Sequence, residues 1–270
     1  MLYSSSDIAQ IVGGQLFGRK DLKISHVLTD SRLISFPEES LFIALVTEKN
    51  DGHRYIEDLY KNNVKCFLVS KSTENFSHLK DATFIVVEDT LLALQKWAKH
   101  HRESFQIPVI GITGSNGKTI VKEWLYQLLN EDYKITRSPR SYNSQIGVSL
   151  SVLQLDTNSN LGIFEAGISK MNEMQRLQSI IQPTIGIFTN LGEAHQENFS
   201  SLEEKCMEKV QLFRDSEAIV FPFDDSVIKK CIDETGFKAK KLVWSKEDKT
   251  ASFYVEKIEK EGNNTRVHYN

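Results

Sequence analysis

A glycine-rich loop carries the clearest chemistry in this sequence. It reads Thr113-Gly-Ser-Asn-Gly-Lys-Thr119 and lies between an apolar, β-branched run and a segment with helical spacing. The backbone N–H groups of such a loop point toward a bound anion, and the dipole of the following helix favours negative charge. Lys118 is placed to reach the outer phosphates of a nucleotide, and the Thr119 hydroxyl is placed to ligate Mg²⁺. The predicted nucleotide-binding residues are Gly114, Ser115, Asn116, Gly117, Lys118 and Thr119.

The loop departs from the strict Walker pattern, because Ile112 stands where that pattern has its first glycine. We interpret it as a tighter variant, Thr-Gly-x-x-Gly-Lys-Thr. The alternative is a structural glycine turn with a solvated lysine, and the agreement of strand, loop, Lys-Thr pair and amphipathic helix argues against it. The apolar residues with helical spacing, which are expected to pack one helix face on the sheet, are Ile120, Val121, Trp124, Leu125, Leu128 and Leu129.

Two further polar residues follow predicted strands. Glu165 ends the apolar run 161–165, and His195 follows the run 185–188. Mg²⁺ prefers carboxylate oxygens, waters and substrate phosphates, so Glu165 is a candidate Mg²⁺ ligand. The alternative is a solvated acid at a strand end, since such acids are common on surfaces. A lone histidine is usually structural or exposed, but His195 belongs to the same predicted rim as Glu165 and Thr119.

A lysine lies on the apolar face of the predicted helix 201–214. At about 100° per residue, Lys209 falls in the middle of the stripe formed by Leu202, Cys206, Val210 and Phe213. Burying a lysine costs free energy unless it is paired or modified. Three interpretations stay open. The side chain extends to the surface, it serves as a functional cation, or CO₂ carbamoylates it into an anionic oxygen ligand.

A loop rich in hydrogen-bond donors, Arg137-Ser-Pro-Arg-Ser-Tyr-Asn-Ser-Gln145, precedes another apolar segment. Over a phosphate site, such a loop is suited to hold a second substrate. A generic surface loop is an equally good interpretation on composition.

The pattern of runs predicts two α/β domains, at 1–105 and 106–270. The first mixes helices with a small sheet, and its expected strands are 23–28, 41–45, 65–69 and 83–87. The second alternates helices with short apolar strands, at 109–113, 162–165, 184–189 and 218–221. This alternation indicates a parallel sheet covered on both faces, in which ligands bind beyond the C-terminal strand ends. From about Thr250 the pattern favours a hairpin whose second strand is cut short.

Bulk properties exclude several classes of protein. The 270 residues are 40% hydrophobic with a net charge of −3, which is typical of a globular protein and gives no sign of nucleic-acid binding. No apolar run approaches the roughly 18 residues of a membrane span, and the N-terminus lacks a signal-peptide pattern. Cys66, Cys206 and Cys231 lie far apart. We therefore expect a cytoplasmic protein with reduced thiols, no disulfide framework and no zinc site.

Taken together, these segments resemble the Mur ligases of peptidoglycan synthesis. The loop 113–119, the Glu165-Ala-Gly strand end, Thr189-Asn-Leu-Gly-Glu-Ala-His195 and Lys209-Val-Gln-Leu-Phe213 occur in the family's order. Other runs resemble the family's UDP-sugar-binding domain, namely Thr29-Asp-Ser-Arg32, Leu41–Leu45 and Asp51-Gly-His53. The runs 143–148 and 194–201 resemble the members that use D-alanyl-D-alanine, and 180–186 is similar to forms fused to an alanine racemase.

The resemblance implies a fold and an activity. The fold is an N-terminal α/β UDP-binding domain followed by a P-loop central domain with a parallel sheet. The activity is an ATP-dependent amide ligation of D-alanyl-D-alanine to UDP-N-acetylmuramoyl-tripeptide through an acyl phosphate, with Mg²⁺. The family's lysine segment typically carries a carbamoylated lysine, which corresponds to Lys209 here.

The resemblance also implies roles for individual residues. Lys118, His195 and Lys209 are the implied catalytic residues. Thr119 and Glu165 would hold one Mg²⁺, and His195 with carbamoylated Lys209 a second. The implied substrate contacts are Ser31 and Arg32 for UDP, with Asn143, Ser144 and Gln145 for the muramoyl-peptide.

The family has a further C-terminal domain and an adenine-contacting segment that this sequence does not contain, so we expect an N-terminal fragment that is inactive alone. Two positions depart from the family pattern, Ser149 in place of a common proline and Glu208 in place of a small residue. Two alternatives remain. One is a folylpolyglutamate-synthase-like ligase, against which the first domain argues, and the other is a non-catalytic module that binds a nucleotide or UDP-sugar.

Overall fold

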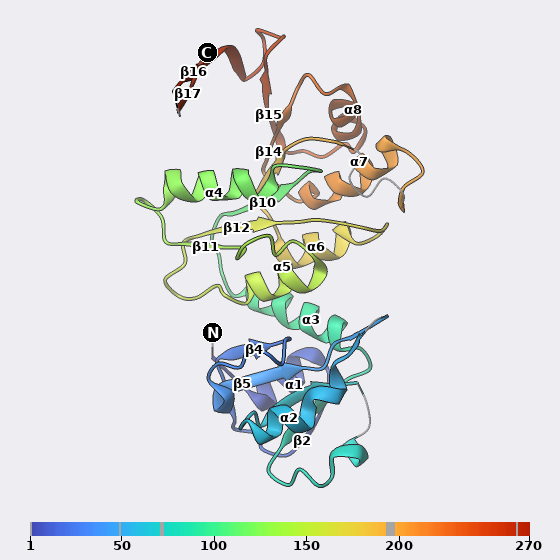
Figure 1. Cartoon of the computed structure of the whole chain (residues 1–270). Helices are drawn as coiled ribbons and strands as arrows, with labels where there is room; N and C mark the ends of the chain where they lie inside the picture. The colour runs from blue at the N-terminus through green and yellow to red at the C-terminus, as the bar shows by residue number, and fades with distance from the viewer. Residues whose placement is uncertain (1, 49, 71–72, 193–197, 263) are drawn as a thin grey trace. The chain divides into compact units, whose positions relative to one another are not determined.

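The chain folds into two compact units, Met1–Ser104 and Phe105–Asn270 (Figure 1). The structure is a computed structural model that describes residues 2–48, 50–70, 73–192, 198–262 and 264–270. Within those residues, every helix is too short or too polar to cross a bilayer.

The first unit is a small α/β layer. Its helices are α1 (Ser5–Val12), α2 (Ile56–Lys61) and α3 (Thr90–Glu103). Its strands are β1 (Tyr3–Ser4), β2 (Gln15–Phe17), β3 (Lys23–Ile24), β4 (His26–Leu28), β5 (Ser40–Ile43), β6 (Val46–Thr47), β7 (Asn50–Asp51), β8 (Cys66–Val69) and β9 (Thr83–Val86). The main sheet has the order β2-β9-β8-β5-β4, in which β2 alone runs antiparallel to its neighbour among the described strands. Stacked phenylalanines at 67, 76 and 84 lie in its core.

The second unit is a larger, mostly parallel sheet. Its strands are β10 (Val109–Thr113), β11 (Ile135–Arg137), β12 (Leu161–Glu165), β13 (Ile185–Phe188), β14 (Ala218–Pro222), β15 (Lys240–Ser245), β16 (Phe253–Glu261) and β17 (Asn264–Tyr269). Its helices are α4 (Lys118–Leu129), α5 (Gln145–Val152), α6 (Met174–Ile181), α7 (Leu202–Val210), α8 (Ser226–Glu234) and the 3₁₀ turn η5 (Gln211–Phe213). The strand order is β11-β12-β10-β13-β14-β15-β16-β17, and β17 pairs antiparallel with β16.

Alternation along the central strands sends side chains to opposite faces of this sheet. Ile110 and Ile112 of β10 pack under α4, and the residue between them is Gly111, whose missing side chain leaves room for Pro183 and Leu212. Gly186 on β13 likewise leaves room for a neighbouring side chain, since a Cβ there would lie 2.2 Å from Phe213. In Figure 1, α4 lies on one side of β10 and β12, and α5 and α6 lie on the other. The sheet is therefore covered on both faces, as predicted.

Most predicted strands agree with the structure. The first unit has four additional strands, which are β1, β2, β6 and β7. The second unit has two, the edge strand β11 and β15, which begins Lys240-Lys241 and so lacks an apolar start. The prediction for helix α4 was wrong in part. Val121, Leu125 and Leu129 pack on the sheet, but Ile120, Trp124 and Leu128 are 57%, 63% and 74% exposed. These three sit at i, i+4 and i+8, on the edge of the apolar arc that faces away from the strands.

Candidate functional site

The glycine-rich loop joins the end of β10 to the start of α4. Gly114 and Gly117 have φ values of 143° and 79°, in the region that favours glycine. A Cβ on Gly114 would also lie 2.0 Å from Thr189 Oγ1. Gly114 therefore lets the loop approach the neighbouring segment, whereas a Cβ at Gly117 would meet no atom and glycine is favoured there by its backbone conformation alone.

That neighbouring segment, 189–192 after β13, braces the loop. Ser115 N–H donates to Asn190 O (2.8 Å), and Asn116 N–H donates to the Asn190 side chain (2.9 Å). Ser115 Oγ bonds both the N–H and the carbonyl of Gly192. Because these two loop amides are already used, the first turn of α4 offers the amides for an anion. Among the described residues, no side chain caps that turn at Gly117.

Lys118 opens α4 and folds back over the loop. Its Nζ donates to Gly114 O at 2.8 Å and to Ser115 O at 3.4 Å. Burial lowers the pKa of Lys118, and the nearby carboxylate of Glu165 opposes that shift. The ammonium is thus held beside the anion-facing end of the helix.

Glu165, at the end of β12, lies next to Thr119. The Thr119 hydroxyl donates to Glu165 Oε2 at 3.0 Å. The Glu165 side chain is 0% exposed, and its Oε1 lies 3.0 Å from Nζ of the equally buried Lys122. The alternative of a solvated acid at a strand end is therefore wrong.

Thr119 and Glu165 provide a pair of oxygen ligands that suits Mg²⁺. Both present hard oxygens to the same point beside the anion-facing turn, and Mg²⁺ takes one or two protein oxygens while keeping waters and phosphates. The described part of the chain contains no group of three or more His, Cys, Asp or Glu residues that could bind a metal. A Mg²⁺ ion bound to nucleotide phosphates does not need such a group. His195, the other predicted ligand, lies outside the described residues.

Lys209 reaches the same loop from α7. It is 3% exposed, and its Nζ lies 3.4 Å from Gly114 O. Extension to the surface is therefore excluded. Burial lowers the pKa of Lys209 to about 7, and the positive charges of Lys118 and Lys205 act in the same direction. A functional cation and a carbamate both remain compatible with this environment.

The predicted substrate residues have structural partners of their own. Ser144 caps α5 by accepting from Gly147 N–H at 3.2 Å, and the Gln145 amide donates to Glu173 at 3.0 Å. Asn143 is linked through its backbone carbonyl, which accepts from Gly167 N–H at 2.8 Å.

In the first unit, Arg32 makes a two-pronged ion pair with Asp30 (2.9 and 2.7 Å), which lowers the pKa of Asp30 to about 2. Arg32 remains 85% exposed, and Ser31 lies beside it. The guanidinium is therefore accessible to a ligand from solvent.

Sequence reasoning missed two buried lysines. Lys122 is 0% exposed, and Lys205, which is 1% exposed, donates to Gly192 O. The helical spacing used for Lys209 finds both. Lys122 is three and seven residues before Leu125 and Leu129, which pack on the sheet, and Lys205 is four before Lys209.

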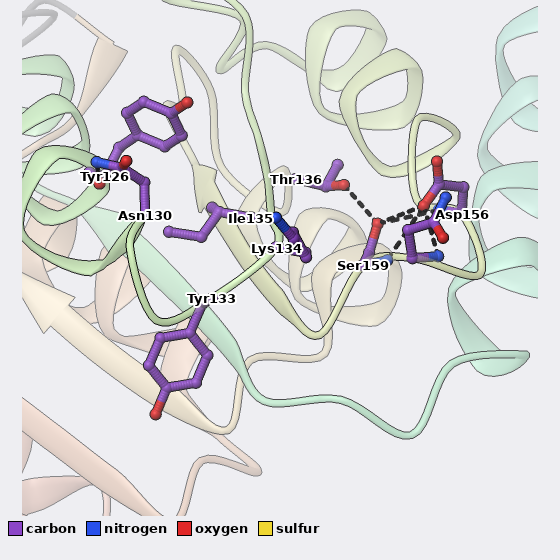
Figure 2. Close-up of a pocket in the computed structure, with 9 residues that line it drawn as sticks. Tyr126, Asn130, Tyr133, Lys134, Ile135, Thr136, Asp156 and Ser159 are labelled. Atoms are coloured by element: carbon purple, nitrogen blue, oxygen red, sulfur yellow. Dashed lines mark hydrogen bonds between the residues drawn. The ribbon is translucent and has the colours of Figure 1, made fainter.

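A surface cavity of about 330 Å³ lies at the other end of the sheet, where β11 and β12 begin (Figure 2). Asp156 at its rim is occupied by its own turn, accepting from Asn158 and Ser159. The cavity contains none of the predicted site residues and is lined by Tyr126, Asn130, Tyr133, Lys134, Ile135, Thr136, Asp156, Asn158 and Ser159.

Comparison with known proteins gives a consistent result. Residues 112–270 match the Mur ligase middle domain. The UDP-N-acetylmuramoyl-tripeptide--D-alanyl-D-alanine ligase of Bacillus subtilis is 32% identical over 208 residues, 76% of this chain and 45% of that protein. MurF from Acinetobacter baumannii has a TM-score of 0.88 at 23% identity, covering 100% of this chain and 58% of that one. MurF from Thermotoga maritima in complex with ADP has a TM-score of 0.78 at 25% identity, covering 90% of this chain and 55% of that one. The chain thus spans about half the length of these relatives.

Proposed function

Because this chain belongs to the Mur ligase family, we propose that it supplies the ATP site and the UDP-sugar unit of an amide ligase. The reaction joins D-alanyl-D-alanine to UDP-N-acetylmuramoyl-tripeptide, as the name of the Bacillus subtilis relative states for that protein. One observation carries the proposal: Lys118, Lys209 and the Thr119–Glu165 pair converge on one anion-facing helix start. We place the reaction in the cytoplasm.

In the proposed reaction, the terminal carboxylate of the tripeptide attacks the γ-phosphorus of ATP, and ADP leaves. The acyl phosphate then reacts with the amine of D-alanyl-D-alanine, which loses a proton as phosphate departs. Negative charge spreads over the transferring oxygens, so the protein contributes mainly position and positive charge. Lys118 supplies that charge at the β- and γ-phosphates.

Thr119 and Glu165 are the proposed ligands of Mg²⁺, which neutralises phosphate charge and acts as a Lewis acid. Lys209 is the proposed carbamate. With a pKa of about 7, about half of the Lys209 side chains are neutral amines at pH 7, and a neutral amine can add to CO₂ and release one proton. His195 is proposed as the partner of this carbamate at a second Mg²⁺.

Ser31 and Arg32 are the proposed UDP contacts, since an exposed guanidinium suits a diphosphate. Asn143, Ser144 and Gln145 are proposed to lie beside the muramoyl-peptide. Ser144 and Gln145 would act largely by holding the loop, because their side chains already bond within the protein.

The test is a phosphate-release assay with ATP, Mg²⁺, UDP-N-acetylmuramoyl-tripeptide and D-alanyl-D-alanine, run beside calorimetric ATP binding. The proposal expects Mg²⁺-dependent ATP binding by this chain, weakened at least tenfold by Lys118→Ala. It also expects that phosphate release by the ligase that contains this chain needs both substrates. Release driven by a folate and glutamate instead would favour a folylpolyglutamate-synthase-like ligase. If that ligase binds ATP but releases no phosphate in the presence of both substrates, the result would favour the non-catalytic module.

A further inference from the structure

Lys122 is a charged side chain without a role in the reaction described above. It lies on α4, four residues after Lys118, and its side chain is 0% exposed. A lysine is rarely buried to this extent without a partner, because its charge loses hydration. The contacts of its ammonium therefore explain why it is there.

One of those contacts, together with a hydrogen bond from Thr119, defines the orientation of Glu165. Lys122 Nζ lies 3.0 Å from Oε1, while Oε2 accepts from the Thr119 hydroxyl at 3.0 Å. In the described part of the chain, Oε1 has this ionic contact and no regular hydrogen bond. The two carboxylate oxygens are thus divided, Oε1 toward the lysine and Oε2 toward the threonine.

The same ammonium also holds the loop that follows β11. Nζ donates to Ser138 O at 2.8 Å and to Arg140 O. Ser138 in turn accepts from the backbone N–H of Glu165 through its hydroxyl, at 3.1 Å. The ammonium therefore connects the start of α4, the end of β12 and the beginning of loop 137–145.

A second acid would keep the lysine paired if Glu165 shared its charge with a metal. Glu123 Oε1 lies 3.1 Å from Lys122 Nζ, and its Oε2 lies 3.0 Å from Arg137. The Lys122 ammonium contacts Glu165 on the oxygen that Thr119 does not use. A cation bound at Oε2 would therefore leave this contact in place.

We propose that Lys122 is a positioning residue that presents Oε2 of Glu165 to the Mg²⁺ of the nucleotide and ties that metal site to loop 137–145. This inference rests on the proposed function, since it takes Thr119 and Glu165 as the metal ligands. Residues that orient a metal ligand typically change metal affinity 10–100-fold when they are removed.

The experiment measures the affinity of the chain for ATP by calorimetry, once in excess Mg²⁺ and once in EDTA. The affinity in Mg²⁺ divided by the affinity in EDTA is called the Mg²⁺ gain. Lys122→Met removes the charge and keeps the side-chain stem. We expect its Mg²⁺ gain to fall about tenfold with ATP affinity in EDTA unchanged within about threefold, a split that general loss of structure does not produce. The exposed Lys134 gives the control Lys134→Met, which should keep the wild-type gain.

A folded Lys122→Met protein with the wild-type Mg²⁺ gain overturns the proposal. If that variant does not fold, Lys122→Gln, which keeps a donor for Ser138 O, replaces it with the same expectation. Failure of both to fold makes Lys122 a structural residue and also overturns the proposal. If the wild-type chain itself shows no Mg²⁺ gain, the proposed function fails, independently of Lys122.

Discussion

At the residue scale, the site is built from buried charges that reach it from different segments. Lys118, Lys122, Lys205 and Lys209 each place an ammonium on backbone carbonyls of the loops around the anion-facing turn. Carbonyl oxygens satisfy the N–H donors without cancelling the charge. Lys118 therefore contributes positive charge where phosphates are proposed to bind, whereas the charge of Lys122 is balanced by Glu123 and Glu165.

Glu208, which departs from the family pattern, has a structural explanation. It is buried beside Lys209 on α7, and its Oε1 accepts from Met174 N–H at 2.9 Å. Met174 is the first residue of α6, whose N-cap residue Glu173 makes no side-chain cap. Glu208 therefore caps α6 from a different helix, and its carboxylate is directed at that backbone.

The depressed pKa of Lys209 predicts a pH effect on stability. Between about pH 7 and the unfolded value near 10.4, the unfolded chain binds a proton at Lys209 that the folded chain does not. The free energy of unfolding contributed by this residue therefore rises with pH in that window, by at most about 1.4 kcal/mol per pH unit, and is lowest below pH 7.

Urea unfolding of the wild type and Lys209→Met at pH 7 and pH 9.5 measures this effect. EDTA and CO₂-free buffer exclude metal and carbamate. The wild type should gain stability relative to the variant as the pH rises. Parallel pH profiles for the two proteins would show that Lys209 is charged at neutral pH.

At the element scale, α4 has two apolar edges that differ in burial. The edge with Leu125 packs on the isoleucines of β10 and β12, and the edge with Trp124 and Leu128 faces solvent. The inner edge also contains Lys122, so part of the buried face of the helix makes an ion pair with Glu165. Periodicity identified the apolar arc, but the sheet decides which half of it is covered.

This division predicts unequal costs for the same substitution on one helix. Leu125→Ala should lower the free energy of unfolding by about 2 kcal/mol, because it opens space against the sheet. Leu128→Ala, at a position 74% exposed, should change it by less than about 0.5 kcal/mol. Urea titrations followed by tryptophan fluorescence compare the two, and equal costs would contradict the packing described here.

At the scale of the whole molecule, the chain consists of two units, each with its own sheet. The proposed phosphate site lies entirely in the second unit and the proposed UDP contacts entirely in the first. Each ligand should therefore depend on side chains of one unit.

Measuring the binding of both UDP and ATP to a variant of each unit tests whether the two sites are separate. Arg32→Ala should weaken calorimetric UDP binding about tenfold, since a charge-assisted pair contributes about 1.5–3 kcal/mol, and should leave ATP binding unchanged. Lys118→Ala should have the opposite pattern. Loss of both ligands in either variant would show that the two sites are not independent.

The sequence by itself determined the order of the motifs, the strand before each one and the family to which they belong. These properties are local, since an apolar run followed by Gly-Lys-Thr or by Glu165 reads the same in isolation. It also placed Lys209 on a buried face, but it left the partners of that lysine open.

Only the tertiary structure decided which charges meet. Thr119 and Glu165 are 46 residues apart, and Lys209 and Gly114 are 95 apart. They are brought together by the strand order β11-β12-β10-β13, which places the C-terminal ends of distant strands at one edge. Strand order depends on packing over the whole sheet, so no local pattern shows that Lys122 lies against Glu165 or that half of α4 faces solvent.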